Sequence, residues 1–424
     1  MLRGDGVSSG GVITMSGQLH NIVWHTGRYF GEDDAPGIDD VLDFGNDSYF
    51  LTNGIFANLT VAYGNDECFT VRGAYNVTIQ DCIVGEPLLN SGSDPVTVPN
   101  TGNIAMLSDG YVAVLRNILH NAYARVPHST RDGNDVRGNL IYNSGLALDA
   151  AHVTAYSYGT RYVNMIGNYI ERGPASSNSW WGITGRYNTN MLYIYATSAD
   201  DAGGYGKAFV TNNVLASLPS AVDAFTHMNV QGGGSFSRSV RAYNVEQPHK
   251  FSTPLTAEQA RQYTIMRAGT MLPSRSTYED KITNSVQTFD YPPATFYGWP
   301  RTVAEAGGYP TLATGTPYVD TDNDGMADEW ELRFWPSITT SNGKSDTDSD
   351  GYTDLEEFLF DGWYCLWLDE DKDWGLDASD YISTNPTRWE DWRIDEQNGP
   401  TEGYGLPRST VIPGLYTRTI IVGG

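Results

Sequence analysis

The sequence contains few cysteines, few basic residues and no long apolar run. Three cysteines occur in 424 residues, at Cys68, Cys82 and Cys365. Their spacing does not match a metal-binding pattern, and an odd number leaves at least one of them unpaired. Cys68 and Cys82 lie in strand-like segments, where we expect them to be small buried side chains.

The scarcity of apolar runs and of basic residues excludes two classes of protein. No stretch of 18 apolar residues is present, so we expect no membrane-spanning helix. The first residues, MLRGDGVSSGG, lack the apolar core of a secretion signal, so we expect a mature or truncated chain, or one not exported by that route. Lysine and arginine total 26 against 51 aspartate and glutamate residues, for a formal charge of -25. This balance argues against nucleic acid as a partner and favours a cation.

The abundant residues indicate a β-rich fold with many turns. The chain has 46 glycines and is 12% aromatic but only 18% charged, which is typical of a globular protein. From Gly11 to about Gln247, short β-like runs alternate with Gly, Asn, Asp and Ser. Many runs begin with an asparagine, namely Asn21, Asn58, Asn76, Asn117, Asn139, Asn168, Asn213 and Asn244.

The spacing of these asparagines predicts a solenoid. Asn117 and Asn139 are 22 residues apart and Asn58 and Asn76 are 18 apart, and a period of about 20 residues is typical of stacked repeats. No amphipathic helix separates the runs, which favours a parallel β-helix over a helical or leucine-rich array. A β-sandwich is the alternative, but its strands should alternate in polarity more regularly. Asparagine suits turns between rungs, and stacked asparagines can form a hydrogen-bonded ladder.

The predicted fold is all-β with three parts. We place the parallel β-helix at residues 1–250, a helix and an extended connection that pack on it at 251–318, and an acidic region at 319–424. Thr256-Ala-Glu-Gln259 is a capping box, and Gly269 ends the run that follows it, so we expect one helix there. Residues 285–318 are rich in proline, glycine and aromatic residues and predict an irregular connection.

The acidic region contains two complete matches to the twelve-residue calcium loop. Five carboxylates in each loop would repel one another without a cation, so we expect Ca²⁺ in a structural role. The expected ligands are Asp320, Asp322, Asp324, the carbonyl of Met326, Asp328 and Glu331 in the first loop, and Asp346, Asp348, Asp350, the carbonyl of Tyr352, Asp354 and Glu357 in the second.

The order of several short phrases resembles the bacterial pectate lyase-like family, in particular members that end in thrombospondin type 3-like calcium repeats. The phrases include Asn65-Asp-Glu67, Asn76-Val-Thr-Ile-Gln80, Glu86-Pro-Leu88, Ala124-Arg-Val-Pro127 and Asn139-Leu-Ile-Tyr-Asn143. The resemblance extends from about residue 10 to residue 360. It implies a right-handed parallel β-helix of the polysaccharide lyase family 1 type.

The resemblance also implies roles for individual residues. In that family an arginine of an Arg-x-Pro motif removes the proton next to a uronate carboxylate, and Arg125 matches it. Because arginine normally has a pKa above about 12, this chemistry requires calcium on the substrate carboxylate, which acidifies the neighbouring C–H. Arg131 matches the arginine that binds a substrate carboxylate. The calcium carboxylates fall on Asp40 and on Asp66, with Glu67 beside it.

Three further side chains are candidates for substrate binding. His128 follows Pro127, where many relatives have a second arginine. Trp180 and Trp181 can stack on sugar rings, or can pack a long loop onto the coil. The lysine that binds substrate in the family has no counterpart between Val96 and Tyr111.

The implied function is an extracellular, secreted or cell-surface lyase that needs calcium and cleaves pectate-like uronans by β-elimination. Its partner is an acidic polysaccharide. Two alternatives stay open. One is a β-helical adhesin of a cell surface or virion, which binds carbohydrate without turnover and for which the absent lysine is an argument. The other is a structural subunit of an extracellular, oligomeric assembly.

Overall fold

The structure is a computed structural model of the whole chain. It describes residues 2–4, 13–15, 19–31, 40–44, 51–65, 67–88, 103–107, 112–122, 126–129, 134–143, 161–171, 173, 192–195, 206–216, 222–223, 228–231, 235–237, 255–271, 275–288, 300–312, 318–340, 342–347 and 353–358. The chain divides into two compact units. The first comprises Met1–Val245, Leu255–Leu312 and Val422–Gly424, and the second comprises Glu246–Pro254 and Ala313–Ile421.

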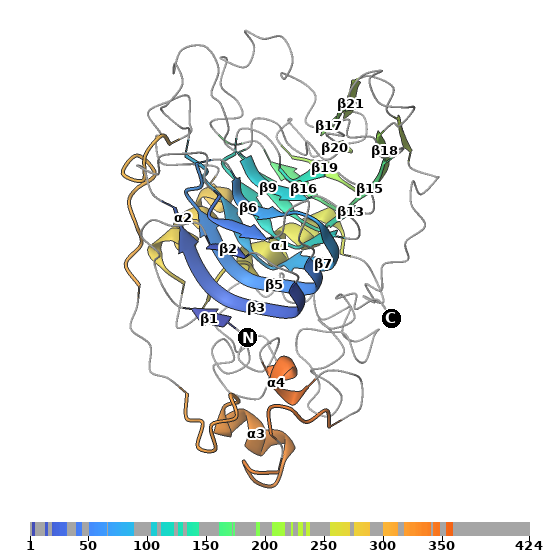
Figure 1. Cartoon of the computed structure of the whole chain (residues 1–424). Coiled ribbons are helices and arrows are strands. Elements are labelled where there is room, and N and C mark those ends of the chain that lie inside the picture. The colour runs from blue at the N-terminus through green and yellow to red at the C-terminus, as the bar shows by residue number, and fades with distance from the viewer. Residues whose placement is uncertain are drawn as a thin grey trace. The chain divides into compact units, whose positions relative to one another are not determined.

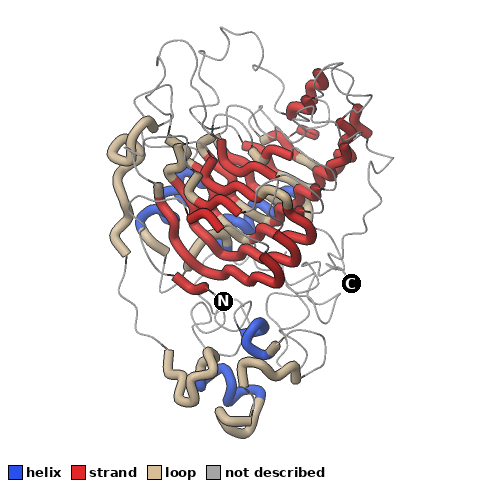
Figure 2. The backbone as a smooth tube through the Cα atoms, in the orientation of Figure 1, coloured by secondary structure: helices blue, strands red, loops and turns tan. Residues whose placement is uncertain are grey.

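The first unit is a parallel β-helix, as the asparagine period predicts, and it is right-handed, as the resemblance implies. Figure 2 shows its stacked strands in red. Its largest sheet contains, in spatial order, β20 (Val222–Asp223), β19 (Val214–Leu215), β16 (Tyr169–Glu171), β14 (Leu140–Tyr142), β11 (Ile118–His120), β8 (Ile83–Gly85), β5 (Leu51–Ala62), β7 (Ala74–Gln80), β10 (Val112–Leu115), β13 (Asn134–Arg137), β15 (Arg161–Ile166), β18 (Gly206–Thr211) and β22 (Ser235–Ser237), with β3 (Leu19–Phe30) beside β5 and β1 (Leu2–Gly4) beside β3. Among the described pairs only β19 and β20 are antiparallel, which rules out the sandwich.

Two smaller sheets complete the described strands. One has the order β12 (His128–Ser129), β9 (Asn103–Leu107), β6 (Glu67–Val71), β4 (Leu42–Phe44) and β2 (Ile13–Met15). The other pairs β17 (Leu192–Tyr195) with β21 (Met228–Gln231). A buried core that includes Phe44, Phe56, Phe69 and Val114 lies within the coil, because alternate residues of each strand point inward.

The asparagine ladder is present inside the turns of the coil. The Oδ1 atom of Asn139 accepts hydrogen bonds from the backbone N–H (2.9 Å) and the Nδ2 (3.1 Å) of Asn117. In the same way, Asn168 Oδ1 accepts from the N–H and Nδ2 of Asn139, and Asn213 Oδ1 accepts from those of Asn168. Each Nδ2 also donates to a strand carbonyl, such as that of Val114 for Asn139 (2.8 Å). The ladder therefore satisfies the polar backbone atoms that each buried turn would otherwise leave without partners.

In each of these turns, the residue with the left-handed backbone conformation directly precedes the ladder asparagine. Arg116 has a φ of 53° and Gly138 a φ of 59°. Asn58 and Asn76 do adopt the left-handed conformation themselves, with φ values of 55° and 58°. The periodic asparagines therefore have two different uses, which the sequence period alone did not separate.

Two helices pack against the coil, and Figure 1 shows both in yellow against its strands. Helix α1 (Ala257–Arg267) has the predicted capping box, since Thr256 N donates to Gln259 Oε1 (2.9 Å) and Gln259 N donates to Thr256 Oγ1 (3.2 Å). Helix α2 (Thr277–Thr288) was missed, and the predicted irregular connection from residue 285 is wrong up to residue 288. Tyr278, Ile282 and Val286 recur at helical spacing and are buried, a pattern that could have revealed it.

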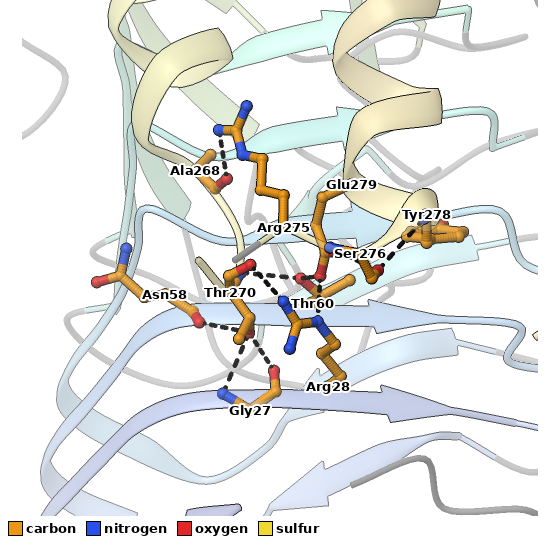
Figure 3. A network of polar contacts seen from close by, with 10 residues as sticks. All are labelled: Gly27, Arg28, Asn58, Thr60, Ala268, Thr270, Arg275, Ser276, Tyr278 and Glu279. Atoms are coloured by element: carbon orange, nitrogen blue, oxygen red, sulfur yellow. Dashed lines mark hydrogen bonds and ion pairs between the residues drawn. The ribbon is translucent and has the colours of Figure 1, made fainter. Parts of the chain in front are cut away.

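A buried polar network holds α2 on β3 and β5, as Figure 3 shows. Arg28 Nε donates to Glu279 Oε1 (2.8 Å), and Thr60 Oγ1 donates to the same oxygen (2.6 Å). The other oxygen of Glu279 accepts from Ser276 N (2.7 Å) and from the Ser276 hydroxyl. Because Arg28 and Glu279 are both fully buried, loss of one partner would leave an uncompensated charge in the interior.

The second unit contains α3 (Asp328–Phe334) and α4 (Asp354–Glu357). Its described core is aromatic. The ring centroids of Trp330 and Phe358 are 5.3 Å apart, and those of Trp330 and Trp335 are 5.4 Å apart. Within the described parts of the chain, no helix is both long enough and apolar enough to cross a membrane.

Cys68 and Cys82 are free and buried, as the sequence predicts. Burial raises the pKa of both thiols. We therefore regard both as structural residues.

Candidate functional site

The five-stranded sheet carries a row of polar side chains that do not point into the core. Asp43 of β4 pairs in register with Thr70 of β6, which pairs with Met106 of β9, and Met106 pairs with His128 of β12. Their neighbours Leu42 and Phe69 lie in the core. Because side chains alternate along a strand, Asp43, Thr70 and His128 belong to the outer face.

Asp40 and Glu67, two of the predicted calcium carboxylates, come together at one end of this sheet. The backbone N–H of Glu67 donates to Asp40 Oδ1 (3.0 Å), and the N–H of Val41 donates to the carbonyl of Glu67 (3.2 Å). Asp40 is 7% exposed and Glu67 is fully buried. The backbone of Glu67 therefore holds the Asp40 carboxylate, although the two residues are 27 positions apart in the sequence.

One further acid, Asp43, and one base, Arg72, lie beside Asp40. Neither of them was identified from the sequence. Arg72 Nη2 lies 3.7 Å from Asp40 Oδ2. Burial raises the pKa of Asp43, the charge of Arg72 opposes the rise and the charge of Asp40 adds to it. The signal for Asp43 was present, because a single acid stands between Leu42 and Phe44 in an otherwise apolar strand.

The predicted reactive and aromatic residues fall outside the described part of the chain. These are Arg125, Arg131, Asp66, Trp180 and Trp181. His128 is described and buried, at 2% exposure, on β12. The structure therefore places His128 on the same sheet as Asp43 and Thr70, and its role in substrate binding stays a prediction.

His120, which lies eight residues before His128 in the sequence, is held by hydrogen bonds in the interior and has a structural role. Its Nδ1 lies 3.0 Å from Asn121 Nδ2, and its Nε2 lies 3.4 Å from the hydroxyl of Tyr278. The amide orientation of Asn121 is set by Asn143, whose Nδ2 donates to Asn121 Oδ1 (2.7 Å). Asn121 thus donates to Nδ1, so the ring proton belongs on Nε2. Burial lowers the pKa of His120 well below its usual range, and the nearby Lys281 adds to this.

Three of the predicted ligands of the first acidic loop lie close together, and their role as calcium ligands stays a prediction. Carboxylate oxygens of Asp320, Asp322 and Asp324 all lie within 4.8 Å of one another. Gly325, with a φ of 100°, makes the sharp turn. Its N–H and that of Asp324 donate to the carboxylate of Asp320 (3.1 and 3.2 Å).

Glu331 is the acid most affected by this cluster. It is fully buried, and neither carboxylate oxygen has a hydrogen-bond partner among the described residues. Burial and the neighbouring aspartates raise its pKa to about 7. A buried carboxylate facing several other acids is the environment that a bound cation would relieve.

Asp328 has a different position from the other acids of the loop. Its two carboxylate oxygens accept from the backbone N–H (2.7 Å) and the hydroxyl (2.6 Å) of Thr321. Asp354 accepts in the same way from Thr347 in the second loop (2.9 and 2.8 Å). The position-9 aspartates therefore hold the start of each loop, which the sequence motif did not indicate.

The second loop is described only in part. Asp346 and Asp354 lie within the described residues, as does the backbone of Glu357. Asp348, Asp350 and Tyr352 lie outside them, so their predicted ligand roles stay predictions. Leu355 of α4 packs on Gly325, and the carbonyl of Asp324 lies so close to Gly343 that a side chain there would meet it. The two loops are thus packed against each other.

Comparison with known proteins identifies several relatives that carry one description. A probable pectate lyase C of Aspergillus fumigatus (strain Af293) is 28% identical over 292 residues, which are 68% of this chain and 61% of that protein. Probable pectate lyase C of Aspergillus flavus is 27% identical over 295 residues. That of Aspergillus terreus is 31% identical over 141 residues, or 32% of this chain. No family model matches the chain.

The chain spans 61% of the length of the first relatives it matches. A solved structure of a thermostable pectate lyase aligns with 59% of this chain and 69% of its own, with a TM-score of 0.31 and 8% identity. The fold assignment therefore rests on the parallel pairing of the strands described above. The relatives found are fungal, and the bacterial origin implied by the resemblance stays a prediction. Together, the coil and these relatives support a pectate lyase-like fold.

Proposed function

We propose that this protein is an extracellular, calcium-dependent polysaccharide lyase that cleaves an acidic, pectate-like uronan by β-elimination. The observation that carries the proposal is the Asp40 carboxylate, which the backbone N–H of Glu67 holds at the end of the five-stranded sheet that carries Asp43 and Thr70. The description shared by its relatives, probable pectate lyase C, agrees with this chemistry.

The residue types at this sheet are those that a divalent cation with a preference for oxygen ligands requires, although among the described residues only Asp320, Asp322 and Asp324 bring three carboxylates within 4.8 Å of one another. Asp40, Glu67 and Asp43 offer carboxylates, and the Thr70 hydroxyl is fully buried with no hydrogen-bond partner among the described residues. Hard oxygen donors of this kind suit calcium. When bound, calcium would acidify the C–H next to the uronate carboxylate and stabilise the negative charge that develops there.

In the proposed reaction, the residues of the chain bind the polymer and move one proton. Arg125 takes the proton from the carbon next to the carboxylate. The electron pair of that C–H bond forms the C=C double bond, the glycosidic C–O bond breaks, and the oxygen of the departing sugar takes a proton from water. Arg131 binds a substrate carboxylate, for which the planar guanidinium is well suited.

The proposal is tested by the absorbance of the unsaturated product formed from polygalacturonate. We expect a signal with calcium and none with EDTA. Asp40→Asn should reduce the rate by at least about tenfold, whereas Asp280→Asn, which changes the same charge on the exposed side of α2, should not. Equal rates in these two variants would remove Asp40 from the site.

We also propose that the two C-terminal loops hold structural Ca²⁺. The supporting observations are the close Asp320, Asp322 and Asp324 carboxylates and the buried carboxylate of Glu331. Calcium binding should then raise the melting temperature of the protein, and EDTA should lower it. A melting temperature that EDTA leaves unchanged would contradict a structural role.

The scarcity of positive charge near the five-stranded sheet favours a second function, binding without turnover. Asp43 and Thr70 occupy the outer row, and the segment from Val96 to Tyr111 contains no lysine or arginine. A carbohydrate-binding adhesin would bind the polymer without turnover, whereas a structural subunit of an extracellular assembly would associate by stacking of its coil. Polymer binding with no unsaturated product at any calcium concentration would favour this alternative.

A further inference from the structure

Arg72 lies beside the acidic group of the five-stranded sheet. It directly follows β6, and its backbone N–H donates to the carbonyl of Phe44 (2.8 Å), which fixes the residue against β4. Arg72 and Thr70 are two residues apart and therefore share the outer face. The guanidinium reaches Asp40, with Nη2 3.7 Å from Oδ2, and its charge also acts on Asp43.

The contact between Arg72 and Asp40 is loose. A separation of 3.7 Å exceeds a hydrogen bond, and the buried Nε of Arg72 has no hydrogen-bond partner within the described residues. Elsewhere in the chain, Arg116 binds Asp81 through two hydrogen bonds of 3.0 and 3.1 Å. The Arg72 side chain is also 39% exposed, whereas that of Arg116 is 3% exposed. Arg72 thus neutralises Asp40 without being fixed to it.

Asp40 is also the carboxylate assigned above to a divalent cation. A cation bound to Asp40 would repel the guanidinium at this distance. We propose that Arg72 is an exchangeable counter-ion, which neutralises Asp40 and Asp43 in the absence of a divalent cation and binds a carboxylate of the acidic polysaccharide once the cation occupies Asp40. The inference rests on the proposed function and adds a regulatory residue to that site.

The chemistry of the released side chain fits an acidic polymer. A guanidinium offers two parallel N–H donors to a carboxylate. The segment from Val96 to Tyr111, where the resemblance places a substrate-binding lysine, has no cation. Arg72 would provide positive charge at the sheet only in the calcium-bound state, so calcium and polymer would bind with positive coupling.

The test compares calcium and polymer binding in four variants of the full chain. Calcium titration of Asp40→Asn identifies the coil site as the class of calcium sites that this variant loses, which separates it from the C-terminal loops. Arg72→Gln should bind calcium at the coil site about three- to tenfold more tightly, because the competing charge is gone. With calcium saturating, the same variant should bind polygalacturonate about tenfold more weakly.

Two control variants separate this role from a purely structural one. Arg301→Gln removes an equally exposed arginine, 38% exposed and paired with Glu305, and should change neither affinity. Arg72→Lys keeps the charge but loses the planar fork, so it should leave calcium affinity unchanged and weaken polymer binding.

The measurements separate failure of the Arg72 proposal from failure of the proposed lyase function. Tighter calcium together with weaker polymer binding in Arg72→Gln supports the proposal. Unchanged calcium affinity, or weakening of both ligands, overturns it while leaving the lyase proposal intact. If Asp40→Asn loses no calcium site, or the unmodified chain binds no polymer, the proposed function and this inference both fail.

Discussion

At the scale of single residues, the ladder asparagines join one rung to the next through buried side-chain hydrogen bonds. Asn139 accepts two hydrogen bonds from Asn117 through one oxygen and donates to the carbonyl of Val114 and to Asn168 through its amide. All of these atoms are buried. The sequence period predicted that asparagines recur, but only the structure shows which of them form the ladder.

Removal of one ladder side chain should cost several hydrogen bonds at once. Asn139→Ala would remove the acceptor of the Asn117 N–H and Nδ2 and one donor to the Val114 carbonyl, all of them buried, so we expect a loss of about 2–5 kcal/mol in the free energy of unfolding. Asn284→Ala, on the exposed side of α2, is the control and should change stability little. Denaturant unfolding measures both, and equal effects would contradict the ladder's role.

Cys82 occupies a ladder position without being an asparagine. The N–H of Leu59 lies 3.5 Å from Cys82 Sγ, and this thiol lies 3.7 Å from the carbonyl of Phe56. These are the two backbone groups that an asparagine at this position would bind. We expect Cys82→Asn to extend the ladder and to be more stable than Cys82→Val by about 1–3 kcal/mol. The reverse order in urea unfolding would show that the thiol site cannot accept the ladder geometry.

The buried histidine should make stability depend on pH. The pKa of His120 is depressed by burial, so the neutral ring is favoured in the fold and stability is lost as pH falls below about 6.5, its ordinary pKa. For one proton the slope reaches about 1.4 kcal/mol per pH unit. Glu86, Lys281 and Tyr278 surround it, and burial raises the pKa of Glu86, which acts in the opposite direction.

Comparison of unfolding free energies between about pH 5 and about pH 7 isolates the histidine. The difference between the unmodified chain and His120→Gln should shrink or reverse at the lower pH, because glutamine does not titrate. A difference that stays constant over this range would mean that His120 does not titrate as described.

At the scale of elements, local sequence patterns predicted some features well and missed others. The capping box fixed the start of α1, because it depends on residues three apart. Helix α2 was missed although its buried residues recur at helical spacing. Its anchor could not be predicted, because Glu279 binds Arg28 and Thr60, which are 251 and 219 residues away in the sequence. The two acidic loops could be predicted as calcium loops from sequence alone, because all of their acids lie within twelve consecutive residues, and calcium binding there stays a prediction.

The first calcium loop should release protons when it binds calcium. The pKa of Glu331 is about 7 without a cation, and calcium requires the ionised carboxylate. About half a proton should therefore leave Glu331 at pH 7 and almost none well above it, and apparent calcium affinity should fall as pH drops through this range. Calorimetry in two buffers of different ionisation enthalpy measures the protons released. Glu331→Gln should abolish that component, and its persistence would contradict the assignment.

At the scale of the whole molecule, the fold was predictable and the site only in part. The asparagine period extends along the chain, so many weak signals agree on the β-helix. The site depends on which side chains of neighbouring rungs share a face. The register between rungs places the Glu67 backbone and the Arg72 side chain beside Asp40. No sequence period predicts that Asp43 and Arg72 lie near each other.

The central claim, cleavage of an acidic uronan by β-elimination, is tested most directly by the mass of the products. Polygalacturonate treated with the full chain and calcium should give oligosaccharides with one unsaturated end, lighter by one water than hydrolysis products. Arg125→Ala should reduce their formation by about 10²–10⁴-fold if the arginine is the base. Products that contain the added water, or no products at any calcium concentration or pH, would contradict the claim.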